Sequence, residues 1–297
     1  VTVASALEEG VVKDGDTYVC KGFETVADYK LKCHVFSTIG SHGSLTVEQA
    51  LMNSCNPYMI HLALEMGNSR FAYYQSLFGF GKITGIDLPG ETTGIVYGDR
   101  MTTIDAACNS FGQTINVNMM QMMAAYCSII NGGMLYQPHI VKRIESANGE
   151  VVKEYKANLV RQTITASTSK LLRRYLKNTV EEGTAKKAGV TGYSVAGKTG
   201  TAQKGDRKDN KWIISFIGHA PAENPKFAIY VVIDEPYGTT GTSGSSADVL
   251  TLTHNILEKL LPYMNVYKDA SDEYEDTSSS PDELTVDGIP AGTASFN

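Results

Sequence analysis

The sequence lacks any run of about 18 consecutive apolar residues, the length that a membrane-spanning helix requires. It also shows no secretory signal peptide and no initiator methionine. The opening residues 1–10 have the pattern of a helix already under way that ends at Gly10. We therefore expect the chain to be a fragment that begins inside a helix.

Net charge of either sign is small outside the end of the chain. Residues 267–297 hold one lysine against eight acidic residues, whereas the net charge of the whole chain is only −6. The body is therefore nearly neutral, which argues against nucleic acid as a partner. The acidic, serine-rich end has the composition of a disordered linker. We predict a domain over 1–265 and a tail over 266–297, which is compatible with the beginning of another small module.

Cysteine is also scarce, with five residues at Cys20, Cys33, Cys55, Cys108 and Cys127. Cys20 and Cys33 flank a strand-like stretch with a turn between them. The sequence is therefore compatible either with a disulfide between them or with two free thiols. A zinc site made of Cys20, Cys33, His34 and His42 lacks the paired ligand spacing typical of such sites. We accordingly predict no metal and no cofactor.

The stretch from Gly192 to Gln203 supports two incompatible hypotheses. Its letters fit a phosphate-binding loop, G-x-x-x-x-G-K-[ST], with Lys198 and Thr199 at its end. They also fit the Lys-Thr-Gly strand of serine acyltransferases that react with penicillin, with Gly200 completing the triplet.

The flanking residues favour the strand. A phosphate-binding loop needs a buried strand before it and a helix that begins at the Lys-Thr pair. Here a polar, glycine-broken segment precedes Gly192, and a charged segment follows Gln203. Two apolar runs come next, 212–219 and 227–234, joined by a turn with two prolines. This order predicts an edge strand followed by two antiparallel strands.

A second polar motif, Ser54-Cys55-Asn56, lies between two predicted helices. Thr46 with Gln49 three residues later indicates a capping box at the first helix, and Pro57 favours the start of the second. Taken alone, Ser-x-Asn is a weak motif, and Asn56 could simply cap the second helix. A tight joint can nevertheless direct these polar side chains into a cleft.

Other segments predict the remaining framework. Residues 18–35 indicate a hairpin, Asn118 with Gln121 a second capping box, and residues 135–152 a strand pair around Asn148-Gly149. Residues 165–182 form an amphipathic pattern. They contain Ser167-x-x-Lys170, which we interpret as a helix N-terminus rather than as a catalytic motif, because it follows Ser54 instead of preceding it.

Taken together, these motifs resemble the transpeptidase domain of class B, monofunctional penicillin-binding proteins, most closely the division and sporulation members. The resemblance covers about residues 1–262. It rests on an ordered set of segments: Ala6-Leu-Glu-Glu-Gly10, Ser54-Cys-Asn-Pro57, Phe78-Gly-Phe-Gly81, Thr84-Gly-Ile-Asp87, Gly112-Gln113, Asn131-Gly-Gly133, Glu182-Gly-Thr184, Ala196-Gly-Lys-Thr-Gly-Thr-Ala-Gln203 and Phe216-Ile-Gly218.

The resemblance implies an α+β fold of the penicillin-binding and serine β-lactamase type. It has a five-stranded antiparallel sheet flanked by helices, with a helical subdomain and the active site between them. The family carries Ser-x-x-Lys, Ser-x-Asn and Lys-Thr-Gly in that order. Because the first is missing here, we expect the nucleophilic serine and its lysine just before Val1.

The implied chemistry is acyl transfer through a serine ester on the D-Ala-D-Ala end of a peptidoglycan stem peptide. Ser54 would relay a proton, Asn56 would hold the substrate amide, and Lys198 would add positive charge. The strand residues Thr199, Gly200, Thr201 and Gln203 would bind substrate, with Gly200 keeping the strand edge clear of a side chain. The Thr201 N–H would contribute to the oxyanion hole.

The resemblance further implies stem peptides, β-lactams and membrane proteins of cell-wall synthesis and division as partners. It implies a place on the extracytoplasmic face of the bacterial membrane, held by an N-terminal anchor. Such a compartment permits a Cys20–Cys33 disulfide, which we predict to form. Two alternatives are a non-catalytic module of the same fold that binds β-lactam or peptidoglycan, and, more remotely, a phosphate-binding-loop nucleotide hydrolase.

Overall fold

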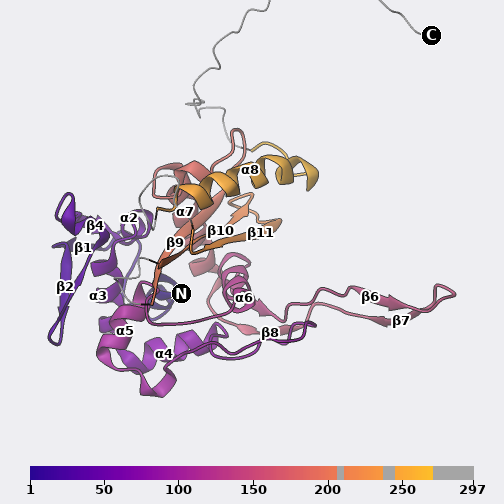
Figure 1. Ribbon diagram of the computed structural model, residues 1–297, viewed down its shortest axis with the longest axis horizontal. Helices are drawn as coiled ribbons and strands as arrows, with labels where there is room; N and C mark the ends of the chain where they lie inside the picture. The colour runs from indigo at the N-terminus through magenta and orange to yellow at the C-terminus, as the bar shows by residue number, and fades with distance from the viewer. Residues whose placement is uncertain (206–210, 237–244, 270–297) are drawn as a thin grey trace, which may run out of the picture.

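The computed structural model describes residues 1–205, 211–236 and 245–269. Its long strands form one antiparallel sheet in the order β11-β10-β9. These strands are β9 (Ala196–Lys204), β10 (Lys211–Ala220) and β11 (Phe227–Asp234). The sheet lies at the centre of the molecule, with α8 (Ala247–Tyr263) above it (Figure 1).

The two faces of β10 are covered by different helices, because successive side chains of a strand point to opposite sides. Ile214 and Phe216 are fully buried in a cluster with residues of α8 such as Leu257. On the other face, His219 bonds to Tyr126 of α6 (Met119–Ile130), so the sheet is enclosed between α8 and α6. The amphipathic helix α7 (Ala166–Glu181) packs along β9.

The first part of the chain supplies most of the helical side of the molecule. Four of its helices enclose the largest apolar core together with α6 and α7: α1 (Thr2–Glu8), α2 (Val47–Met52), α3 (Asn56–Met66) and α4 (Asn68–Leu77). The helix α5 (Thr103–Ser110) packs in two smaller apolar clusters. Single turns of 3-10 helix lie at η1 (His34–Ser37), η2 (Gly98–Arg100) and η3 (Lys186–Ala188).

The remaining strands are short and pair in separate two-stranded sheets. They are β1 (Thr17–Cys20) with β4 (Gly43–Thr46), β2 (Phe23–Val26) with β3 (Tyr29–Lys32), β5 (Met134–Tyr136) with β8 (Leu159–Gln162), and β6 (Arg143–Glu145) with β7 (Val151–Glu154). Figure 1 shows the β6–β7 hairpin projecting away from the domain.

The α+β fold class is confirmed, but the strand count differs from the expectation. Within the described ranges the central sheet has three strands rather than five. The other described strands are only three or four residues long, and they pair with one another instead of joining the central sheet. The hairpin expected over 18–35 is also reorganised: β2 pairs with β3, while β1 pairs with the more distant β4. The strand pair around Asn148-Gly149 is confirmed as β6 and β7.

No helix in the described part of the chain combines the length and apolar character needed to cross a bilayer. The end of the described chain packs on the domain. Val266 is buried with the α8 cluster, and the Asp269 carboxylate accepts hydrogen bonds from the backbone and hydroxyl of Ser194. The expected tail beyond Asp269 lies outside the described residues.

Candidate functional site

Ser54 occupies the joint between α2 and α3. The helix before it begins at a capping box, in which Thr46 and Gln49 satisfy each other's backbone N–H groups. Ser54 itself has φ = 51°, in the left-handed region that non-glycine residues enter at a cost of about 1–3 kcal/mol. The chain therefore bends sharply at Ser54, and α3 begins two residues later.

The Ser54 hydroxyl is in contact with the amine of Lys198 on β9. The distance from Lys198 Nζ to Ser54 Oγ is 2.5 Å, and Nζ also donates to the carbonyl and hydroxyl oxygens of Thr199 at 3.1 Å each. Burial of the amine lowers the pKa of Lys198 to about 8. An amine with this pKa, held against a hydroxyl, can both take and return a proton near neutral pH.

A third hydroxyl, that of Thr184, completes this network, and the sequence reasoning did not identify it as a site residue. Thr184 Oγ1 lies 3.5 Å from Ser54 Oγ and 3.4 Å from Thr199 Oγ1. The adjacent Gly183 is required by close packing, because a Cβ there would lie 2.8 Å from the Thr179 carbonyl oxygen and 2.9 Å from that of Met52. The sequence signal that could have identified Thr184 is its place in Glu182-Gly-Thr184, one of the segments that carry the family resemblance.

The remaining predicted substrate-binding residues lie along β9, an edge strand of the described sheet. Thr201 is exposed, while Thr199 and Gln203 are half-buried. The expected role of Gly200, which is to keep the strand edge clear for substrate, stays a prediction. A Cβ there would also lie 2.5 Å from Ser215 Oγ on the neighbouring strand β10, so the Ser215 hydroxyl would have to move.

Asn56 is the first residue of α3, and Cys55 is its N-cap residue. The Asn56 side chain makes no capping bond. Its amide nitrogen donates instead to the Lys32 carbonyl oxygen at 3.2 Å. This bond ties the joint to β3, so the simple capping interpretation of Asn56 does not hold.

The phosphate-binding-loop alternative is contradicted by the backbone. Lys198 lies within β9 and pairs with Ile217 of β10, so no helix begins at the Lys-Thr pair. Ser167 and Lys170 lie exposed in the first turn of α7, where Thr165 is the N-cap residue. The interpretation of that segment as a helix start is confirmed.

The predicted Cys20–Cys33 disulfide is wrong, because both cysteines are free thiols in the structure. Their sulfur atoms turn toward the imidazole of His42 instead of toward each other. Cys55, the middle residue of Ser-x-Asn, is fully buried and lies in the same group. It therefore faces away from any substrate at Ser54, as expected from the sequence.

The family model described as "Penicillin binding protein transpeptidase domain" matches residues 1–258. Stage V sporulation protein D of Bacillus subtilis is 39% identical over 272 residues, which cover 90% of this chain and 41% of that protein. Peptidoglycan D,D-transpeptidase FtsI of Escherichia coli is 31% identical over 276 residues, covering 91% and 44%.

The fold is also similar to that of a solved structure. Penicillin binding protein 3 from Mycobacterium tuberculosis, complexed with ampicillin, superposes with a TM-score of 0.80 at 28% identity. The superposition covers 92% of this chain and 62% of that one. The chain spans less than half the length of the curated relatives described above.

Proposed function

The chain belongs to the family of penicillin-binding protein transpeptidase domains, and from this premise we propose that it forms the acyl-transfer domain of a peptidoglycan D,D-transpeptidase. The longer protein would act in bacterial division or sporulation, as the names of the similar proteins suggest. The observation that carries the proposal is the 2.5 Å contact between Lys198 Nζ and Ser54 Oγ, which joins two family motifs into one proton-transfer network.

The proposed reaction follows from the positions of the side chains. The nucleophile is the serine of a Ser-x-x-Lys motif that precedes Val1 in the longer protein, and it attacks the carbonyl of the penultimate D-Ala. Ser54 passes its proton to the leaving D-Ala nitrogen. Lys198 stabilises the charge that this transfer leaves on Ser54 and then returns a proton to it. An amine on a neighbouring stem peptide then attacks the ester, which forms the cross-link and releases the enzyme.

Substrate binding is assigned to the free edge of β9. An extended stem peptide can add to this edge as a further strand, and Thr199, Thr201 and Gln203 lie along it. The Thr184 hydroxyl, between Ser54 and Thr199, extends the row of donors toward the substrate carboxylate. The Asn56 amide would hold the substrate amide from the opposite side. A β-lactam would occupy the same groove as a substrate analogue.

The same proposal places the domain outside the cytoplasmic membrane, where peptidoglycan is cross-linked, with the longer protein anchored by an N-terminal segment. Membrane proteins of cell-wall synthesis and division are its proposed partners. No cofactor takes part in the proposed acyl transfer, because the groups described above supply its proton transfers.

The test is covalent labelling of the full-length protein by a fluorescent penicillin. Lys198→Ala should slow acylation by about 100-fold or more, the size of effect expected when a positioned proton-transfer group is removed. Lys204→Ala is the matched control, because Lys204 is on the same strand but its amine pairs with Asp234 and Glu235 at the surface. It should label at the wild-type rate.

Mass spectrometry of the labelled peptide locates the nucleophile. A label on a serine upstream of Val1 supports the proposal, whereas a label on Ser54 or Ser167 contradicts the assigned roles. If the folded protein binds penicillin reversibly and forms no covalent adduct, the enzyme hypothesis is rejected. The alternative, a non-catalytic module that binds β-lactam or peptidoglycan, is then supported.

A further inference from the structure

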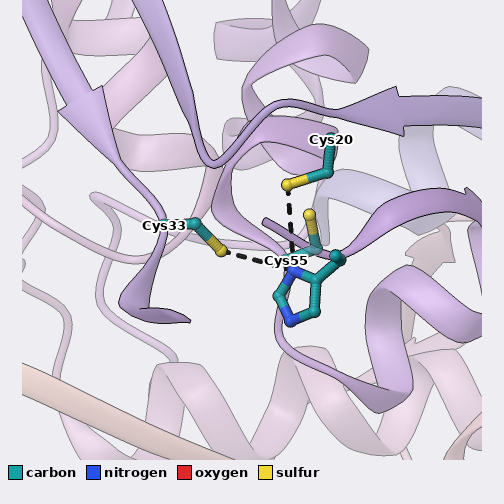
Figure 2. Close-up of side chains that lie close together, drawn as sticks. Cys20, Cys33 and Cys55 are labelled. Carbon is teal, nitrogen blue, oxygen red and sulfur yellow. Dashed lines mark hydrogen bonds between the residues drawn. The ribbon is translucent and has the colours of Figure 1, made fainter. Parts of the chain in front are cut away.

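Four side chains with metal-binding atoms converge beside the catalytic joint. Cys20 ends β1, Cys33 is the residue before η1, and Cys55 is the N-cap residue of α3. Together with His42, which lies just before β4, they form what we call the Cys3His cluster. Its three sulfur atoms and one imidazole nitrogen all lie within 4.8 Å of one another. Figure 2 shows the three cysteine side chains close together, with dashed lines from Cys20 and Cys33 to one imidazole nitrogen.

The distances from His42 Nδ1 to two of the sulfurs are close to those of a tetrahedral zinc site, and the cysteines are not joined in disulfides. Zn–S bonds of about 2.3 Å and Zn–N bonds of about 2.0–2.1 Å give tetrahedral edges of about 3.8 Å between two sulfurs and about 3.5 Å between sulfur and nitrogen. His42 Nδ1 lies 3.5 Å from Cys33 Sγ and 3.8 Å from Cys20 Sγ. A disulfide would require about 2.05 Å between two sulfurs.

The ligand sulfurs lie in a polar but enclosed pocket of backbone. The Gly22 backbone N–H donates to Cys20 Sγ at 3.4 Å. The three cysteines are 0–3% exposed, so the ligand sulfurs are enclosed by protein.

We propose that the Cys3His cluster binds one Zn²⁺ ion as a closed structural site. Three thiolates and one imidazole form one of the ligand sets that structural zinc sites use, and the four protein ligands leave no open position for chemistry. Soft sulfur ligands in tetrahedral arrangement select zinc over magnesium or calcium. The site is separate from the acyl-transfer groups and does not depend on the proposed function.

The Cys3His cluster shares three of its four ligands with the zinc site that the sequence analysis considered. His34 is replaced by Cys55, since His34 Nε2 lies 2.9 Å from the Asn53 carbonyl oxygen and does not join the cluster. The ligand spacing in the chain, at positions 20, 33, 42 and 55, contains no closely spaced pair. Only the fold, which brings β1, η1 and α3 together, reveals the site.

The proposed ion would also fix the position of the catalytic joint. Cys55 is directly bonded to both Ser54 and Asn56, so a metal held by Cys55 restrains the backbone on either side. Ser54 has a left-handed backbone conformation that needs such support. This second step rests on the proposed function, whereas metal binding itself can be tested without it.

The primary test measures metal in the full-length protein, purified without chelators under both anaerobic and aerobic conditions. We expect elemental mass spectrometry to find about one zinc ion per chain. We also expect the metal-depleted protein, titrated with Co²⁺, to show the absorption bands of tetrahedral cobalt bound to thiolates. Both readouts use the wild-type chain, so they do not depend on a variant that folds.

Matched variants identify the ligands. Cys33→Ser should weaken Zn²⁺ binding by about 100-fold or more, at least as much as loss of an outer-shell partner costs other metal sites. Cys108→Ser and His34→Gln remove a thiol and an imidazole outside the cluster, and both should keep wild-type affinity. The proposal is overturned if wild-type protein binds Zn²⁺ no more tightly than Cys33→Ser, or if intact mass shows a disulfide within the cluster in the anaerobic sample.

The positioning role has its own readout. Chelation of the metal should lower the rate of penicillin acylation, and added Zn²⁺, but not Mg²⁺, should restore it. An acylation rate that is unchanged by complete metal removal would reject the positioning role and leave the metal site standing. Failure of labelling in every sample would instead reject the proposed function.

Discussion

At the scale of single residues, the amine of Lys198 connects the groups of the site, because its Nζ contacts Ser54 Oγ and donates to both oxygens of Thr199. Ser54 and Lys198 were predicted from two motifs, and the structure brings their side chains into contact. Thr184 was missed because one threonine after a glycine has no chemical signature of its own. The close approach of Ser215 Oγ to Gly200 could not be predicted either, because Ser215 lies on a different strand.

The buried amine of Lys198 makes the stability of the domain depend on pH. The pKa of Lys198 is about 8 in the folded state against 10.5 in the unfolded chain, because burial disfavours the charged form. Below pH 8 the unfolded state is favoured by its tighter proton binding. The penalty disappears as the pH rises from 8 to 10.5, where neither state holds the proton.

We therefore predict that Lys198→Met stabilises the folded domain at pH 7 by on the order of 2 kcal/mol while slowing acylation as Lys198→Ala does. Urea unfolding of both proteins at pH 7 and pH 10 measures the difference, which should shrink markedly at the higher pH. A difference that is the same at both values would show that desolvation of the amine is not its cause.

At the scale of elements, local signals predicted helix starts and strand pairs where the partners are close in sequence. Both capping boxes, at Thr46 and at Asn118, are present, and so is the β6–β7 hairpin. The pairing of β1 was not predicted, because its partner β4 lies beyond the β2–β3 hairpin and no local pattern selects it. Pairing between segments distant in sequence depends on the packed core that holds them together.

The capping box of α2 supports the helix that leads into Ser54. Thr46→Ala removes the hydroxyl that accepts the Gln49 N–H and should lower the free energy of unfolding by about 1 kcal/mol. Thr46→Ser keeps that acceptor and serves as the control, with an expected loss of only a few tenths of a kcal/mol. An equal loss in both variants, measured by thermal or urea unfolding, would assign the effect to packing of the threonine methyl group.

At the scale of the whole molecule, polar contacts between distant elements connect layers that are otherwise apolar. His219 of β10 is fully buried and accepts a hydrogen bond at Nδ1 from the Tyr126 hydroxyl of α6, while its Nε2–H donates to the Ala222 carbonyl oxygen. Burial lowers the pKa of His219 to about 4, so the ring is neutral at pH 7. The sequence showed only an isolated histidine in an apolar strand, which gave no indication of this contact.

Tyr126→Phe leaves the buried Nδ1 of His219 without a donor, and we expect a loss of about 1–3 kcal/mol in the free energy of unfolding. Penicillin labelling of the folded fraction should not change, because neither residue belongs to the acyl-transfer network. The exposed Tyr73 offers a control, since Tyr73→Phe removes an equivalent hydroxyl at the surface. A Tyr126→Phe protein as stable as Tyr73→Phe would contradict the structural importance of this bond.

The contact between Lys198 and Ser54 has a consequence for the order of folding, because it joins residues 144 positions apart. Closing so long a loop costs chain entropy that only the completed sheet and core can offset. The four cluster ligands, in contrast, all lie between positions 20 and 55 and can meet while the rest of the chain is still emerging. Metal capture would then report early assembly of the first 55 residues, and penicillin reactivity would report completion of the domain.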